Sequence, residues 1–391
     1  MQVVEEARKL QAEIVENRRA VHSYAEIGFE LPKTYEFVKQ KLIEYGYAPV
    51  PVGRSGLVCT AGKGGKTILL RADMDALPME EKSGLPFAAK NGNCHSCGHD
   101  VHTAMLLGAA KLLKQHENEL CGTIKFMFQP AEELLGGAWD MIENGVLENP
   151  HVDAAMALHI VVGQNTSAPG RICYIEGCVT NSGDAITIQV IGKDGHGSRP
   201  ELAVDAIHVA AHIVIALEEL VARECGAAQE AVVLVGRIEG GTSVNSVAGT
   251  AKLEVSVRSD SHDQRAFLVR RVQEVAEGIA KTFRAEAIVE HAYGVPPLVN
   301  DDKLLAETTS YLREVLPEEL VLSIPKIGGS EDFTMVAEKV PSVYMNFGVG
   351  RPEDGCPHFL HHPEMKIDES GLYIGTASYV QCAVRWLEEH P

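Results

Sequence analysis

Apolar residues follow two different patterns in the first part of the chain. Short apolar runs of strand length alternate with longer stretches in which apolar residues recur every three or four positions. The first pattern is typical of strands buried on both faces, and the second of helices packed on one side. This alternation predicts an α/β fold in which helices cover both faces of a sheet. Strands are expected at 67–73, 123–128 and 153–160, and helices at 3–20, 102–116 and 136–145.

The pattern changes at about residue 184. Residues 185–191 and 251–257 alternate strictly between apolar and polar, which is typical of a sheet with one face in water. Helical periodicity at 204–224 and 263–283 completes a compact β-α-β-β-α-β unit of ferredoxin-like type. After Pro296-Pro297 the α/β pattern resumes, with a helix at 301–315, a strand at 342–348 and a closing helix near 369–388.

The length of the chain agrees with two domains. A chain of 391 residues is too long for one ordinary core. The change of pattern predicts a helix-covered mixed-sheet domain formed by residues 1–183 and 296–391. An α+β domain at residues 184–295 is expected to be inserted into it.

Charge and cysteine usage restrict the partners and the compartment. The net charge of −19, from 35 basic and 54 acidic residues, argues against nucleic acid and anionic membrane surfaces as partners. The nine cysteines show no disulfide-dense pattern, and the N-terminus is unlike a signal peptide. The most apolar helical run, residues 203–217, is shorter than the roughly 20 residues of a membrane span. We therefore expect a cytoplasmic protein.

Residues 94–102 combine two cysteines, three histidines and an acid. Thiolate, imidazole and carboxylate groups together suit zinc or a related transition metal. Cys94 and Cys97 are spaced as in half of a structural zinc knuckle, but the chain contains no second such pair. The favoured interpretation is that Cys97 and His99 are ligands of a catalytic metal.

Further candidate groups lie far along the chain. Glu132 and Glu133 follow an apolar strand and a proline, so one can bind metal while the other accepts a proton from water. Taken alone, His159 is more often a core residue and His196 a turn residue. The loop histidines His358, His361 and His362 are as consistent with metal binding as with a surface loop.

Eight motifs follow one another along nearly the whole chain: Leu70–Pro78, Ser96–Asp100, Phe128–Glu133, Ala157–His159, Gly195–Pro200, Gly240–Asn245, Gly329–Phe333 and Leu360–Pro363. Together they resemble the amidohydrolase branch of the aminoacylase/carboxypeptidase family of dinuclear metallopeptidases. That branch includes aminoacylases, hippurate hydrolases and indole-acetyl-amino-acid hydrolases. Two positions depart from the family pattern: Ser246–Gly249 replaces a turn that often contains proline, and Val101 replaces a glycine. Neither removes a candidate ligand.

The resemblance implies a specific set of site residues. Two divalent metal ions would be bound by Cys97, His99, Glu133, His159 and His361. Glu132 would be the general base, and Asp75 would orient a ligand. The inserted domain would act as a lid and dimerisation module, on which His196 helps hold the oxyanion, often in the active site of the partner subunit. Asn245 and Arg258 would grip the substrate carboxylate, with Gly329 at the substrate site.

The resulting hypothesis is a metal-dependent amidohydrolase that cleaves N-acyl amino acids as a homodimer, with higher homo-oligomers left open. Zinc is the favoured metal, and manganese, cobalt and nickel remain alternatives. The same scaffold also suits a dipeptidase, a carboxypeptidase-like enzyme, an aminobenzoyl-glutamate hydrolase or an N-acetyl-diaminopimelate deacetylase. A non-catalytic binding protein with a structural metal is an alternative from another class, although such a protein would not need an unliganded base such as Glu132.

Overall fold

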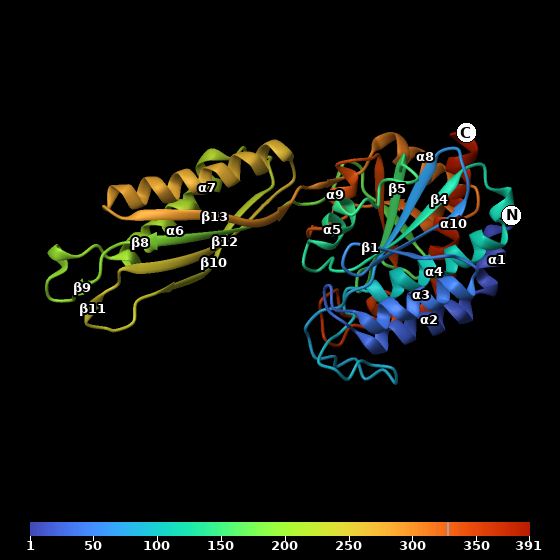
Figure 1. Cartoon of the computed structure of the whole chain (residues 1–391), viewed down its shortest axis with the longest axis horizontal. Helices are drawn as coiled ribbons and strands as arrows, with labels where there is room; N and C mark the ends of the chain where they lie inside the picture. The colour runs from blue at the N-terminus through green and yellow to red at the C-terminus, as the bar shows by residue number, and fades with distance from the viewer. Residues whose placement is uncertain (327) are drawn as a thin grey trace. The chain divides into compact units, whose positions relative to one another are not determined.

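The computed structural model describes residues 1–326 and 328–391, which divide into two compact units (Figure 1). The first unit contains Met1–Val179, Val299–Lys326 and Asp332–Pro391. The second contains Thr180–Leu298 and a short later segment that ends at Glu331. The chain thus leaves the first unit and returns to it twice.

A mixed sheet forms the centre of the first unit. Within the described residues it has eight strands, in the order β1-β2-β4-β3-β5-β16-β6-β15. The neighbours β4, β3, β5 and β16 are all parallel, whereas β2 runs antiparallel to β4. The strands are β1 Val50–Val52, β2 Gly56–Gly62, β3 Thr67–Asp73, β4 Thr123–Gln129, β5 Ala154–Val161, β6 Ile172–Tyr174, β15 Val321–Ser323 and β16 Ser342–Gly348. A separate two-stranded pair joins β7 Cys178–Thr180 to β14 Leu298–Val299.

Helices cover both faces of this sheet. On one face α4 and α10 lie against β3 and against each other, and on the other face α5 and α9 contact β4 and β16. The division follows from side-chain alternation along β3, because Ile68, Leu70 and Ala72 enter the core below α4 and α10 while Arg71 and Asp73 point the other way. The helices are α1 Val3–Lys9, α2 Gln11–Tyr24, α3 Pro32–Glu44, α4 His99–Gln115, α5 Gly137–Glu143, α8 Asp302–Arg313, α9 Thr334–Ala337 and α10 Leu372–Glu389.

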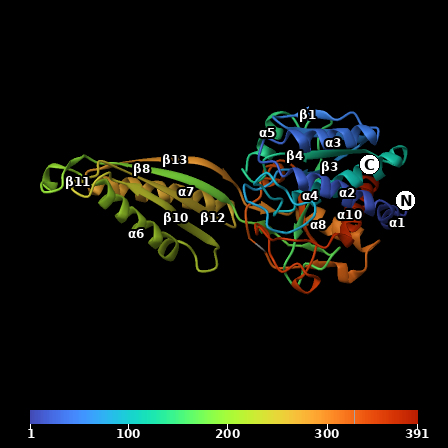
Figure 2. The same ribbon diagram turned by 90° about the horizontal axis from the view of Figure 1, so that it is seen from below.

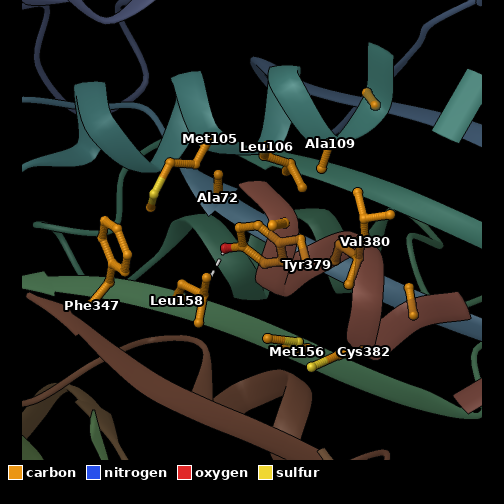
Figure 3. Packing of buried hydrophobic residues seen from close by; sticks show 14 of the residues in the cluster. Ala72, Met105, Leu106, Ala109, Met156, Leu158, Phe347, Tyr379, Val380 and Cys382 are labelled. Carbon is orange, nitrogen blue, oxygen red and sulfur yellow. Dashed lines mark hydrogen bonds between the residues drawn. The ribbon is translucent and has the colours of Figure 1, made fainter. Parts of the chain in front are cut away.

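The main core lies between the sheet and the pair α4 and α10 (Figure 3). Met105, Leu106 and Ala109 of α4 pack over Met156 and Leu158 of β5. The hydroxyl of Tyr379 on α10 donates to the Arg71 carbonyl at 2.8 Å and accepts from the Leu158 amide at 2.9 Å. This buried tyrosine therefore ties α10 to two neighbouring strands near the ends that carry the site.

The N-terminal helix is divided, whereas the periodicity predicted one helix over residues 3–20. The amide of Leu10 bonds the Ala7 carbonyl at 2.9 Å, a tighter turn than an α-helix makes, and α2 begins at Gln11. The division matches the packing, because α1 lies mainly on α10 and α2 mainly on α4.

The second unit is an antiparallel sheet with two helices on one side. Its strand order is β10-β12-β8-β13, and Figure 2 shows α6 and α7 on the same side of that sheet. Its elements are β8 Gly183–Ile191, β9 Gly195–His196, α6 Ala206–Glu224, β10 Ala231–Gly240, β11 Ser246–Val247, β12 Thr250–Ser259, α7 His262–Thr282 and β13 Glu286–Val295. This connectivity is the ferredoxin-like arrangement expected from the sequence, and the predicted fold class is confirmed.

None of the helices that the structure describes is both long and apolar enough to cross a membrane.

Candidate metal centre

The candidate metal residues lie at one edge of the large sheet. Because β4, β3 and β5 are parallel neighbours, their carboxyl ends meet at the same edge. Asp75 follows β3, Glu132 and Glu133 follow β4, and His159 lies near the end of β5. α4 begins at His99, so its first turn and the preceding Cys97 reach the same place.

Cys97 lies between two of the candidate histidines. Its Sγ is 3.5 Å from Nε2 of His159 and 3.3 Å from Nε2 of His361. The His361 ring also reaches Glu133, with Nε2 at 3.5 Å from Oε1. His361 has a left-handed backbone, with φ of 60°, and its amide donates to the Ser96 carbonyl at 2.8 Å. The loop near the C-terminus is thus fastened directly to the cysteine segment.

His99 is fully buried among carboxyl groups. Its Nδ1 is 3.4 Å from Asp75, and its Nε2 is 3.7 to 3.9 Å from Asp73, Glu132 and Glu133. Neither ring nitrogen hydrogen-bonds to any residue that the structure describes. Burial alone would lower the pKa of His99, but the surrounding carboxylates raise it to about 10. The position therefore favours positive charge.

The turn after β4 presents two acids with different surroundings. The amides of Glu132 and Glu133 donate to the two carboxyl oxygens of Asp75, at 3.0 and 3.2 Å. Asp75 thus fixes the backbone of this turn and also lies beside His99. Although burial opposes ionisation, His361 and His99 lower the pKa of Glu133. Oε1 of Glu133 has no hydrogen-bond partner among the described residues.

Other donors nearby are already occupied. Nδ1 of His102 bonds Asp73 at 2.5 Å, and its Nε2 accepts from the Ile160 amide at 2.8 Å. Both ring nitrogens of His102 are therefore used, so it supports the site and has no lone pair left for a metal. His159 differs, because Nδ1 donates to the Ile160 carbonyl at 2.8 Å and Nε2 faces Cys97.

The donor set fits divalent metal ions. Cys97, His99 and His159 place their ligand atoms within 4.8 Å of one another, and so do Cys97, Glu133 and His361. Burial and the nearby glutamates raise the pKa of the Cys97 thiol, so a cation is needed to stabilise the thiolate. Unpartnered buried groups on His99 and Glu133 give independent support, because buried polar atoms normally have partners. All five proposed ligands lie in the first unit and meet at this edge.

His358 and His362 lie apart from this cluster. Their rings stack with centroids 3.9 Å apart, and Nε2 of His358 is 3.4 Å from Glu364. The Glu364 amide donates to Nδ1 of His362 at 3.1 Å. Of the three histidines in this loop, His361 is the one that reaches Cys97.

The remaining candidates lie in the second unit, in two separate places. β9 and β11 pair His196 with Ser246, beside Asn245, and the Gly197 amide donates to the Asn245 carbonyl at 2.8 Å. Arg258 donates to Ser330 Oγ at 2.8 Å, next to Gly329, whose carbonyl accepts from the Asn181 amide at 2.9 Å. The ten-residue strand β12 separates the two places, and at the usual rise per residue such a strand is about 30 Å long. Asn245 and Arg258 of one chain therefore do not meet on one carboxylate in this arrangement.

Sequence reasoning assigned no role to the charged groups behind the site. Arg71, Asp73 and Asp332 are fully buried and paired with one another. The signal available was the placement of Arg71 and Asp73 two residues apart in an apolar strand, which puts both side chains on one face.

A helix-covered mixed sheet with a cluster of Cys, His and Glu donors at its carboxyl edge, and a second carboxylate beside it, is typical of a metal-dependent hydrolase. The chain belongs to peptidase family M20/M25/M40, whose model matches residues 69–385. It is therefore an enzyme that hydrolyses amide bonds.

Relatives with stated activities span nearly the same length. An N-acetyl-L-cysteine deacetylase of Bacillus subtilis is 35% identical and covers 97% of this chain and 90% of its own length. A hippurate hydrolase of Campylobacter jejuni is 32% identical, over 99% of this chain and 100% of its own. A solved dinuclear metal-binding peptidase of family M20 from Bacillus subtilis is 30% identical with a TM-score of 0.82, covering 97% of this chain and 99% of its own.

Proposed function

We propose that this protein hydrolyses the amide bond of N-acyl amino acids, releasing a carboxylate and a free amino acid. The observation that carries the proposal is His99, buried among four carboxyl groups without a hydrogen-bond partner in the described residues, with Glu132 beside it. The relatives that deacetylate N-acetyl-L-cysteine and hydrolyse hippurate support this substrate class, since both substrates are N-acyl amino acids.

Two divalent metal ions are the proposed cofactors. Cys97, His99, Glu133, His159 and His361 would hold them. The mixture of thiolate, imidazole and carboxylate favours zinc, and manganese, cobalt and nickel are the alternatives to test. When bound, such ions polarise the amide carbonyl and increase the acidity of the attacking water. The solved dinuclear relative supports the number of ions.

Glu132 is the proposed general base. Its side chain is 8% exposed and reaches within 3.8 Å of His99, so it lies at the donor cluster yet remains accessible to a water molecule. The Asp75 carboxylate accepts a hydrogen bond from the Glu132 amide, and this bond fixes the direction of the Glu132 side chain. Glu132 would take the proton of the attacking water and deliver it to the departing amine. This proton transfer distinguishes the role of Glu132 from that of Glu133, which contacts His361 and is proposed as a metal ligand.

The substrate carboxylate is assigned to Arg258, whose guanidinium suits a two-oxygen acceptor. Ser330 and Gly329 lie beside it in the second unit. His196 and Asn245 lie at the other end of β12. We propose that they enter the active site of a second copy of the chain, where the partner subunit's His196 would stabilise the oxyanion.

The second unit has a surface suited to pairing two copies. β10 is the outer strand of its sheet and exposes Val232, Leu234 and Ile238. The neighbouring helix α6 exposes Ile207 and Ile215. An apolar strand at a sheet edge is a ready template for another strand, so we propose a homodimer through this edge.

A reducing compartment, the cytoplasm, is proposed from the cysteines. All nine are free thiols in the structure, and six of them are buried in the first unit.

A substrate and metal screen tests the proposal. Metal-free protein would be loaded with zinc, manganese, cobalt or nickel and assayed on N-acetyl, N-benzoyl and N-indolylacetyl amino acids and on dipeptides. We expect metal-dependent turnover of the acyl amino acids, lost with chelator and regained with metal. Turnover restricted to dipeptides would contradict the substrate class. Unfolding on chelation without hydrolysis of any substrate would indicate a structural metal instead.

A further inference from the structure

The turn between β4 and α5 has a backbone that requires support. It runs from Pro130 to Gly136 and carries Glu132 and Glu133. Ala131 and Leu135 have left-handed backbones, with φ of 54° and 52°, which residues other than glycine rarely adopt. At Gly137 an added Cβ would lie 1.6 Å from the Pro130 carbonyl oxygen, so the two ends of the turn touch. Strained conformations of this kind persist only when surrounding contacts hold them.

One buried carboxylate bonds both ends of this turn. Oδ1 of Asp332 accepts from Nε2 of Gln129, the last residue of β4, at 2.7 Å. Oδ2 of Asp332 accepts from the amide of Ala138, in the first turn of α5, at 2.9 Å. Asp332 has no exposed surface, so these bonds are shielded from water.

Arg71 completes the arrangement. It donates to Oδ1 of Asp332 at 3.1 Å, to Oε1 of Gln129 at 2.9 Å and to Asp73 at 2.7 Å. Its guanidinium therefore pairs the charge of Asp332 and fixes the orientation of the Gln129 amide. Asp73 continues the chain of contacts to His102 and lies 3.7 Å from His99.

We propose that Asp332 is a positioning residue of this enzyme: it bonds both ends of the turn whose middle is held by Asp75, so its carboxylate helps to set the positions of Glu132 and Glu133, and with them the metal affinity and the rate. The inference rests on the roles proposed for these two glutamates. Asp332 touches neither glutamate side chain in the bonds described and acts through the backbone of the turn.

The substitution Asp332→Asn distinguishes a hydrogen-bonding role of the Asp332 carboxylate from a role in which the side chain only fills space in the core. An amide has nearly the same size as a carboxylate, but one of its two groups is a donor. In either orientation an NH2 group would face a donor, either the Ala138 amide or the Gln129 and Arg71 groups. Nothing else in the core is removed.

Asp153→Asn is the matched control. Asp153 also pairs a cation and a backbone amide, with Lys66 at 2.6 Å and the Thr67 amide at 2.9 Å. It does so at the opposite end of β3, away from the turn. The Asp153→Asn variant should therefore lose a charged hydrogen-bonding group, as Asp332→Asn does, without displacing Glu132 and Glu133.

The experiment measures three quantities for wild type and both variants. These are hydrogen exchange of the peptide covering residues 130–138 in metal-free protein, metal affinity by chelator competition, and kcat and KM on an N-acetyl amino acid. In Asp332→Asn we expect at least tenfold faster exchange in this peptide and a 10- to 100-fold lower metal affinity and kcat, with KM within about threefold. Asp153→Asn should match wild type in all three.

The outcomes distinguish this proposal from the proposed function. Wild-type exchange and metal affinity in Asp332→Asn would overturn the positioning role, as would equal losses in Asp153→Asn. Absence of turnover in wild type would overturn the proposed function alone, since exchange and metal affinity still report on the turn. If Asp332→Asn does not fold, the variant Gln129→Met tests the positioning role instead. It removes the bond at one end only and should give a smaller change of the same kind, whereas wild-type behaviour would overturn the proposal.

Discussion

At the scale of single residues, the site is governed by excess negative charge around one imidazole. Four carboxyl groups lie between 3.4 and 3.9 Å from the nitrogens of His99, which is fully buried. Buried charge is costly unless it is paired or bound to a metal. Divalent cations bound there would relieve this repulsion and also provide a partner for the thiol of Cys97. The carboxylates that repel one another in this cluster therefore also give it affinity for divalent metal.

A second buried charge, Lys125, gives a stability prediction. Its ammonium donates to the carbonyls of Val146, Glu148 and Pro150 at 2.7 to 2.9 Å, and the residue is 1% exposed. Lys125→Met should lower the free energy of unfolding by about 2–4 kcal/mol, because three carbonyls lose their donor. Denaturant unfolding measures this change. A loss below about 0.5 kcal/mol would show that the three carbonyls find other partners.

Residue chemistry was only partly predictable from the sequence. Cys97 and His99 could be proposed as ligands from their types and spacing, whereas the choice of Glu132 over Glu133 as the base came from the family resemblance. The pairing of Arg71 with Asp332 could not be predicted, since 261 residues separate them and only the fold brings them together. His102 offers the same donor atoms as His99, and only the two hydrogen bonds seen in the structure show that both of its ring nitrogens are already used.

At the scale of elements, α4 is the main support of the site. Its first residue is His99, and Asp100 beside it bonds Arg18 at 2.6 Å and His22 at 2.7 Å, both from α2. The two helices are thus locked together where the ligands begin. Strand positions were predictable because apolar runs buried on both faces are distinctive. The division between α1 and α2 was not, because it depends on which helices they pack against.

The end of α4 provides a pH-dependent contact. His116 bonds Glu119 at 2.9 Å and Glu6 of α1 at 2.8 Å. The hydrogen bond to Glu119, opposed by slight burial and aided by Glu6, raises the pKa of His116 above its usual 6.5. Because the folded protein holds this proton more tightly, the stabilisation is fully present below pH 6.5 and is lost as the pH rises through the raised pKa.

His116→Gln tests this contact. The variant should be less stable than wild type at pH 5.5 by a few tenths of a kcal/mol up to about 1, and nearly equal at pH 8.5. Thermal unfolding of both proteins at the two pH values measures the difference. A larger deficit at pH 8.5 than at pH 5.5 would contradict the assignment.

At the scale of the whole molecule, the second unit presents its two groups of candidate residues at opposite ends of one sheet. His196 and Asn245 lie beyond the start of β12, and Arg258 lies near its end. A small N-acyl amino acid cannot contact both places in one copy of this unit. In the proposed homodimer, two chains would contribute to each active site, which would resolve this separation.

Mixing two inactive variants tests the shared site. In a heterodimer of Glu132→Gln and His196→Ala chains, one site would combine an intact Glu132 with the partner subunit's His196. Subunit exchange in an equal mixture should restore about a quarter of wild-type activity, because half of the dimers are mixed and each has one complete site. No recovery after verified exchange would mean that His196 acts within its own chain.

The central claim is that Glu132 moves the proton during metal-dependent amide hydrolysis. The most direct measurement is the turnover number of Glu132→Gln together with its metal content. Glutamine keeps the shape but cannot accept the proton, so we predict wild-type metal content and a kcat lowered by about 10²- to 10⁴-fold. A Glu132→Gln variant that binds metal and turns over near the wild-type rate would contradict the account.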